Sequence, residues 1–251
     1  MQKRITSKHV AILFCLVICF VSCAHKSGHR RDRERPGTTM AGCSNGKSSR
    51  STARKSKIVN KRSSNKLEGS QIFDRYGSAV FMVFTTDGFN TYQGSGFFID
   101  NGGLAVSNYH VFKGTGMGLE QIKLAGSDVA YKVTEIITRS EDEDFILFRV
   151  DCENNNYIPI ATEKPKIGEK VYAIGSPRGL ENTFSSGEVS QWRADNLMQI
   201  SALIDHGSSG GALINEYGEV VGITSGSFAD GSQANLNYAW SIDIVKPYLR
   251  Q

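Results

Sequence analysis

Two adjacent serines, Ser208 and Ser209, lie among glycines in the stretch IDHGSSGGAL (204–213). A serine hydroxyl is a poor nucleophile until a base takes its proton, and an imidazole does this when a carboxylate fixes its tautomer. The chain carries both partners. His110 lies in SNYHVF, at the end of an apolar strand pattern, and Asp144 closes the acidic run EDED immediately before FILFRV. These residue types predict nucleophilic chemistry by a Ser–His–Asp set.

Each of the three residues also has a structural interpretation. A histidine at a strand end is more often structural, EDED is typical of a solvated turn, and GSSGG is typical of a linker. The order His, Asp, Ser along the chain favours chemistry, because it is the order found in proteases made of two β-barrels.

The elements that must position these residues are short apolar runs of strand length. They are rich in Val, Ile, Phe and Tyr, and turns bearing Gly, Asn and Asp separate them. The only helical pattern is IDIVKPYLRQ at the C-terminus, interrupted by Pro247. This pattern predicts an all-β sandwich or a pair of barrels. The expected strands are 79–86, 94–99, 104–112, 145–150, 170–175, 198–204 and 220–226.

Cysteine and histidine spacing points to no cofactor. Cys152 is the only cysteine of the last 185 residues, so we expect a single thiol there and no disulfide framework. The five histidines form no HxxxH pair, so we expect no metal site.

Five stretches follow one another along the chain: GSGFFIDNGGLAVSNYHVF, DEDFILFRV, IGSPRGLENTFSSGEVS, DHGSSGGALINEYGEVVGI and LNYAWSIDIVKP. In this order they resemble the protease domain of the HtrA (Deg) family of trypsin-like serine proteases, from about residue 70 to the end. The resemblance implies two six-stranded antiparallel β-barrels with the active site in the cleft between them. It assigns His110 as general base and acid, Asp144 as the group that orients it, and Ser209 as nucleophile.

The resemblance also implies an oxyanion hole in the Gly-x-Ser-Gly-Gly turn. The backbone N–H groups of Gly207 and Ser209 would be its donors, with Ser208 as the spacer between them. Digestive relatives have an aspartate at the spacer position, which binds a new N-terminal ammonium after cleavage. KIVN (57–60) looks like such a cleavage site, but Ser208 offers no carboxylate to the ammonium, so we expect the loops around 176–187 to order the hole instead. The family often regulates this step through a PDZ domain, and because the chain stops at Gln251 we expect none here.

Substrate preference is inferred from the same alignment. It places Leu203 and Ile204 at the floor of the primary pocket and Ser225, Gly226 and Ser227 in its walls. An apolar floor favours small or medium aliphatic side chains over Lys or Arg. The strand through Thr224–Gly226 is expected to pair with an extended substrate backbone.

The N-terminal residues 1–22 have the features of a signal peptide. A basic start precedes VAILFCLVICFV (10–21), a run of 12 apolar residues that is too short for the ~20 residues of a membrane span. FVSC (20–23) resembles a bacterial lipobox, so Cys23 is a candidate lipidation site. Cleavage by an ordinary signal peptidase near Ala24 is the alternative.

Residues 23–68 are expected to form a disordered basic tether, and residues 69–251 the protease domain. Between residues 24 and 66 there are thirteen Lys and Arg against two acids, whereas residues 67–251 are net acidic. A basic tract without hydrophobic periodicity does not fold by itself. It would act as a solvated spacer held near anionic lipid; nucleic acid is a less favoured partner.

Together these features predict a serine endopeptidase that cleaves unfolded or exposed polypeptides and is anchored in the bacterial cell envelope, facing the periplasm. Three alternatives remain open. They are a silent or partner-activated protease-fold peptide-binding protein, a scaffold in which the basic arm is the working part, and an enzyme that processes one partner protein.

Overall fold

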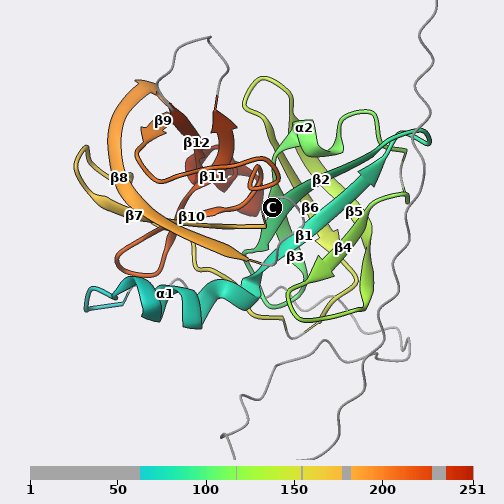
Figure 1. Cartoon of the computed structure of the whole chain (residues 1–251), viewed down its shortest axis with the longest axis horizontal. Helices are drawn as coiled ribbons and strands as arrows, with labels where there is room; N and C mark the ends of the chain where they lie inside the picture. Colours follow the sequence, from blue (N-terminus) through green and yellow to red (C-terminus); the bar gives the residue numbers. More distant parts are fainter. Residues whose placement is uncertain (1–62, 117, 154, 177–181, 228–235, 251) are drawn as a thin grey trace, which may run out of the picture. The chain divides into compact units, whose positions relative to one another are not determined.

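The strands of the protein close into two separate barrels, as Figure 1 shows. The computed structural model describes residues 63–116, 118–153, 155–176, 182–227 and 236–250. Within these ranges twelve strands pair antiparallel into two closed six-stranded barrels. The predicted fold class is therefore confirmed.

The first barrel has the strand order β1-β2-β3-β6-β5-β4. Its interior holds a cluster of aromatic rings, with Phe81 and Phe98 centred 4.6 Å apart and Phe112 and Phe148 5.1 Å apart. Cys152, two residues beyond β6, is disulfide-bonded, so the expectation of a single thiol there is wrong. The strands are β1 (Val80–Thr86), β2 (Thr91–Phe98), β3 (Leu104–Ser107), β4 (Gln121–Leu124), β5 (Ala130–Ser140) and β6 (Phe145–Val150).

The second barrel repeats the same plan in the order β10-β11-β12-β9-β8-β7. Smaller aliphatic side chains fill its interior, among them Val171, Val189 and Leu213. The strands are β7 (Lys170–Gly175), β8 (Thr183–Ala194), β9 (Leu197–Ile200), β10 (Ala212–Asn215), β11 (Val220–Ser227) and β12 (Asn237–Ser241).

A third apolar cluster joins the two barrels. It contains Val106 and Leu147 of the first barrel and Ile174 and Ile223 of the second, all fully buried. Each such side chain contributes roughly 1.5–3 kcal/mol when it leaves water. The barrels therefore share a core, and groups on their facing edges can be held at fixed positions.

Helix α1 (Gly69–Tyr76) was not predicted, and it covers one side of the second barrel. The side chain of Gln71 accepts a hydrogen bond from the backbone N–H of Glu68 at 2.9 Å, which satisfies a donor left open at the helix start. Ile72 and Tyr76 lie one turn apart and are both buried. The helix passes directly into the 3-10 turn η1 (Gly77–Ala79), which leads to β1.

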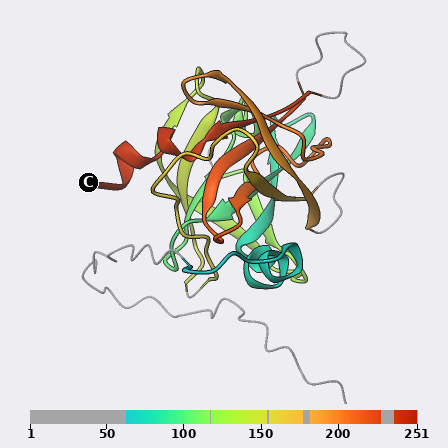
Figure 2. The ribbon, with the colours of Figure 1, turned by 90° about the vertical axis from the view of Figure 1, so that its left-hand side faces the viewer.

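The C-terminal pattern forms two 3-10 turns, η3 (Ile242–Ile244) and η4 (Lys246–Arg250), and not the expected helix. Pro247 has no N–H to donate to the carbonyl of Asp243, so η3 and η4 do not join into one α-helix. Figure 2 shows these turns leaving the second barrel, and the ring of Tyr248 lies 5.8 Å from that of Phe145 in the first.

The β1–β2 hairpin ends in a tight turn held by the carboxylate of Asp87. This group accepts hydrogen bonds from the backbone N–H groups of Asn90 and Phe89 and from the hydroxyl of Tyr92. These donors hold the pKa of the Asp87 carboxyl well below its usual range. Gly88, between them, has a φ of +91° and open space around it.

None of the helices in the described ranges has the length and apolar character needed to cross a bilayer.

Candidate active site

His110 lies on a short helix and not at the end of a strand as predicted. β3 ends at Ser107, Asn108 caps the next element, and α2 (Tyr109–Phe112) carries the histidine. The backbone N–H of His110 donates to Asp144 Oδ1 at 2.9 Å, and its ring Nδ1 lies 2.8 Å from Asp144 Oδ2. Because the carboxylate contacts both groups, it holds the ring in one orientation.

This contact selects the tautomer of His110. A carboxylate accepts hydrogen bonds, so the proton belongs on Nδ1 and the lone pair is left on Nε2. The His110 side chain is 47% exposed, whereas that of Asp144 is 18% exposed. The ring can therefore meet a substrate while its partner is largely shielded from water.

Asp144 stands in a backbone conformation that few non-glycine residues adopt, with φ of +46°. Residues held in this way are common at functional sites, where the surrounding structure compensates the strain. Here the side chain of Asn108 donates to the backbone carbonyl of Asp144 at 2.8 Å. The hydroxyl of Ser225 donates to Asp144 Oδ2 at 3.0 Å from the second barrel.

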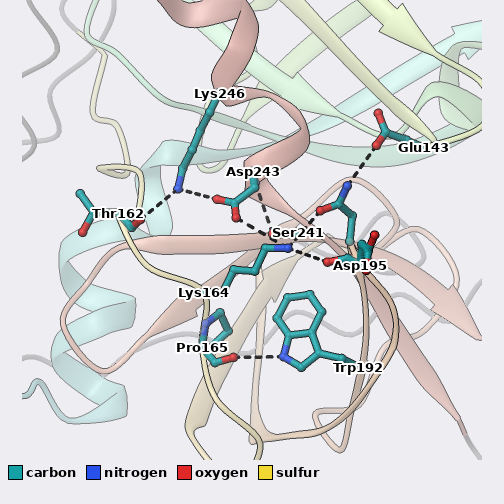
Figure 3. Close-up of polar contacts among 10 residues, drawn as sticks. Glu143, Thr162, Lys164, Pro165, Trp192, Asp195, Ser241, Asp243 and Lys246 are labelled. Carbon is teal, nitrogen blue, oxygen red and sulfur yellow. Dashed lines mark hydrogen bonds and ion pairs between the residues drawn. The ribbon is translucent and has the colours of Figure 1, made fainter.

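The neighbour of Asp144 is also tied to the second barrel. The side chain of Asn196, in the β8–β9 turn, donates to Glu143 Oε1 at 3.2 Å (Figure 3). Lys164 Nζ holds the β8–β9 turn by donating to the carbonyl of Asp195 (2.6 Å) and to Asn196 Oδ1 (3.2 Å). The turn that carries Asp144 is thus held by Asn108 from its own barrel and by Asn196 from the second.

Ser209 lies on the glycine-rich loop between β9 and β10, half-buried, while Ser208 is buried behind it. Three amides next to Ser209 have acceptors. The N–H of Ser208 donates to the Asp205 carbonyl at 2.9 Å, that of Gly210 to Thr224 at 2.7 Å, and that of Gly211 to Ser208 at 2.9 Å.

Two amides that alternate with these three have no such partner within the described ranges. Among the described residues, the N–H groups of Gly207 and Ser209 have no acceptor, and these are the two predicted oxyanion-hole donors. Gly207 has φ of +92°, a conformation that a side chain would strain. The loop therefore leaves both amides available to bind an oxyanion.

The three candidates meet around the bulge of β11. A Cβ placed on Gly226 would lie 3.4 Å from Ser209 Oγ, and the preceding residue, Ser225, binds Asp144. Within the described ranges no hydrogen bond joins Ser209 Oγ to His110. Substrate-free sites often show this spacing, because the bond tightens when a substrate enters.

The predicted substrate-binding residues do not all lie as expected. Leu203 is 70% exposed, so it is not the floor of a closed pocket, whereas Ile204 packs on the interior of the second barrel. Thr224 is buried, and its backbone and hydroxyl all bind the Ser209 loop, with Oγ1 donating to the Ser208 carbonyl at 2.7 Å. Thr224 therefore supports the loop, and only Ser225 and Gly226 remain to pair with a substrate.

Sequence reasoning missed the hydroxyl of Ser225 as a partner of Asp144, having placed this residue in a pocket wall. No pattern local to β11 marks it, because the carboxylate lies 81 residues earlier. In the part of the chain that the structure describes, no group of three or more His, Cys, Asp or Glu side chains is arranged to hold a metal ion.

Two closed barrels with a His–Asp pair on one and a serine loop on the other define the trypsin fold. The family model described as "Trypsin-like peptidase domain" matches residues 94–223, just over half of the chain and a range that includes His110, Asp144 and Ser209. The chain therefore belongs to the trypsin-like peptidase family.

Its relatives are of the HtrA (Deg) type, as the sequence resemblance indicated. It is 32% identical to a probable periplasmic serine endoprotease DegP-like of Rhizobium meliloti over 61% of this chain and 32% of the relative. It is 28% identical to Protease Do-like 1, chloroplastic, of Arabidopsis thaliana, over 65% of this chain and 40% of the relative. The chain thus spans well under two thirds of the length of these curated relatives.

A solved structure shows the same architecture. The serine endoprotease from Yersinia pestis superposes with a TM-score of 0.65 and 26% sequence identity, covering 73% of this chain and 67% of that one.

Proposed function

We propose that the protein is a serine endopeptidase that hydrolyses peptide bonds of unfolded or exposed polypeptides in the bacterial cell envelope. The observation that carries this proposal is the double contact of Asp144 with the backbone and ring of His110, beside a serine loop with two unused amides. A binding protein that never cleaves has no use for either arrangement.

The reaction follows from this geometry. Ser209 Oγ attacks the peptide carbonyl carbon while His110 Nε2 takes the hydroxyl proton, and the N–H groups of Gly207 and Ser209 bind the oxyanion that forms. The intermediate collapses, the C–N bond breaks, and His110 gives its proton to the leaving amine. A water molecule then repeats the two steps on the acyl-enzyme and releases the acid.

The substrate is an extended chain of polypeptide. The edge of β11 at Ser225 and Gly226 offers backbone beside Ser209, and only an unfolded segment or an exposed loop can pair with it. The family resemblance puts Leu203 where enzymes that cleave after Lys or Arg carry a carboxylate, so we infer that Lys and Arg are not the preferred side chains.

A fluorophosphonate probe tests this function on the full chain, purified in detergent, in the wild type and in the variants Ser209→Ala and Ser208→Ala. We expect labelling and casein hydrolysis to disappear in Ser209→Ala and to persist in Ser208→Ala, because only the first removes the nucleophile. An unlabelled wild type that is folded would contradict the proposal and favour a silent or partner-activated binding protein.

We also propose export to the periplasm and a lipid anchor at Cys23, which lies outside the described residues, as do the rest of the predicted signal peptide and most of the tether. The name of the Rhizobium relative includes the word periplasmic, and a disulfide-bonded Cys152 suits an oxidising compartment. Mass spectrometry of the mature N-terminus tests the anchor. A Cys23 that carries acyl chains supports it, and an unmodified N-terminus near Ala24 overturns it.

A further inference from the structure

A continuous chain of hydrogen bonds leads from the N-terminal turn η1 to the loop of the candidate nucleophile. It starts at the Gly77 carbonyl, which accepts from Asn182 Nδ2 at 2.5 Å. Asn182 Oδ1 accepts from Ser176 Oγ at 3.2 Å, and the backbone N–H of Ser176 donates to Ser95 Oγ at 2.9 Å. Ser95 Oγ then donates to the Gly207 carbonyl at 2.7 Å.

Ser95 is the centre of this chain. Its side chain is fully buried in β2, between Gly94 and Gly96. The hydroxyl has a single proton, which it gives to Gly207, and it accepts from Ser176. Its backbone N–H also donates to the carbonyl of Ser209 at 2.8 Å.

Ser95 thus holds the carbonyls of Gly207 and Ser209, the same two residues whose N–H groups are unused. The Gly207 carbonyl shares its peptide plane with the N–H of Ser208, and the Ser209 carbonyl shares its plane with the N–H of Gly210. Holding both carbonyls from the first barrel fixes the two planes that flank the Ser208–Ser209 peptide, which carries one unused N–H. It also fixes the plane that directly follows Gly207, whose permissive backbone carries the other unused N–H. This fixed arrangement is what a preorganised oxyanion hole requires.

Asn182, near the η1 end of this hydrogen-bond chain, is held in a strained backbone conformation. Asn182 has φ of +26°, outside the range that most residues adopt. Its side chain bridges the Gly77 carbonyl and the Ser176 hydroxyl, which ties the start of β8 to η1 and to the end of β7. The position of η1 is therefore linked to the loop through Asn182, Ser176 and Ser95.

We propose that Ser95 is a positioning residue for the oxyanion hole, and that Asn182 couples the N-terminal turn η1 to it. This inference rests on the proposed function, since it assigns what keeps that site competent. Neither the Ser95 hydroxyl nor the Asn182 amide touches the substrate.

The experiment compares the full-length wild type with Ser95→Ala, Asn182→Ala and Ser241→Ala. Ser241 is an equally buried hydroxyl of the second barrel that caps η3, so it controls for the loss of one internal hydrogen bond. The readouts are kcat and KM for a p-nitrophenyl ester, and hydrogen–deuterium exchange of the peptide spanning residues 204–211.

In Ser95→Ala we expect kcat to fall about tenfold to a hundredfold while KM stays within about twofold, because donors that are misdirected lose transition-state binding first. Amide exchange in residues 204–211 should rise in Ser95→Ala, rise less in Asn182→Ala, and match the wild type in Ser241→Ala.

Unchanged exchange in Ser95→Ala would overturn the inference whatever the activity does. Equal losses of kcat in Ser95→Ala and Ser241→Ala would also overturn it, because they would show a general loss of stability. If the wild type neither hydrolyses the ester nor reacts with fluorophosphonate, the proposed function fails, and the exchange measurement still decides whether Ser95 holds the loop.

Discussion

The two halves of the candidate site are held in different ways. In the first barrel, the carboxylate of Asp144 contacts both the backbone N–H and the ring of His110. In the second barrel, Ser209 is placed by backbone hydrogen bonds of its loop to β11 and to β2. The first half depends on the chemistry of particular side chains. The second depends on the shape of the loop backbone, so substitutions there should lower activity by distorting the loop.

The largest effect within this comparison is expected from Asp144→Asn. An amide of the same shape cannot accept from both the backbone and the ring of His110, so the wrong tautomer is selected and kcat should fall about ten-thousandfold. The unfolding free energy should change little. Asp142→Asn, an exposed carboxylate of the same turn, is the matched control and should retain activity in steady-state kinetics.

Gly210→Ala should distort the backbone of the loop that carries Ser209. A Cβ there would lie 2.2 Å from the carbonyl oxygen of Ser95 and 2.3 Å from the hydroxyl of Ser107, at φ of +87°. We expect fluorophosphonate labelling to fall about a hundredfold and the unfolding free energy to fall by about 2–4 kcal/mol.

Gly88→Ala separates the effect of the positive φ from the effect of the close contacts of the new Cβ. Gly88 has nearly the same φ, +91°, but no atoms near the new Cβ. The unfolding free energy of Gly88→Ala should fall by about 1–2 kcal/mol, the cost of the left-handed conformation for a residue with a Cβ. Its rate of fluorophosphonate labelling should not change. If both variants labelled at the wild-type rate, the loop would not depend on close packing against β2.

The smallest effect is expected from Ser225→Ala, where the two halves meet. Removing one hydroxyl donor from the Asp144 carboxylate should lower kcat/KM about tenfold, since His110 continues to hold the same group. Ser201→Ala, which removes an exposed hydroxyl of the second barrel, serves as control. A loss as large as that of Asp144→Asn would show that the carboxylate is oriented mainly from the second barrel.

Apolar patterns predicted many of the strands because these depend on local signals, and the family resemblance predicted the two barrels and the three candidate residues. The expected runs at 79–86, 145–150 and 170–175 are strands within one residue of the prediction, since their apolar side chains face the core. β5 went unpredicted because two bulges, between Val133 and Glu135 and between Ile136 and Thr138, break its alternation of apolar and polar residues.

The missed parts of the site depend on contacts between distant segments. Ser95 reaches Gly207 across 112 positions, and Ser225 reaches Asp144 across 81. Neither hydroxyl differs from an ordinary strand serine in the sequence. The helix that carries His110 was hidden for a related reason, because SNYHVF continues the apolar pattern of β3 although the chain turns after Ser107.

Each barrel is built from one uninterrupted run of sequence, with β1–β6 first and β7–β12 second. A break in the exposed stretch between Thr162 and Glu163 would leave His110 and Asp144 on one fragment and Ser209 on the other. Each fragment would expose its share of the apolar cluster that joins the barrels, and covering that surface would drive the fragments together. Substrate hydrolysis by a mixture of the two fragments would therefore show that they had associated into one complex.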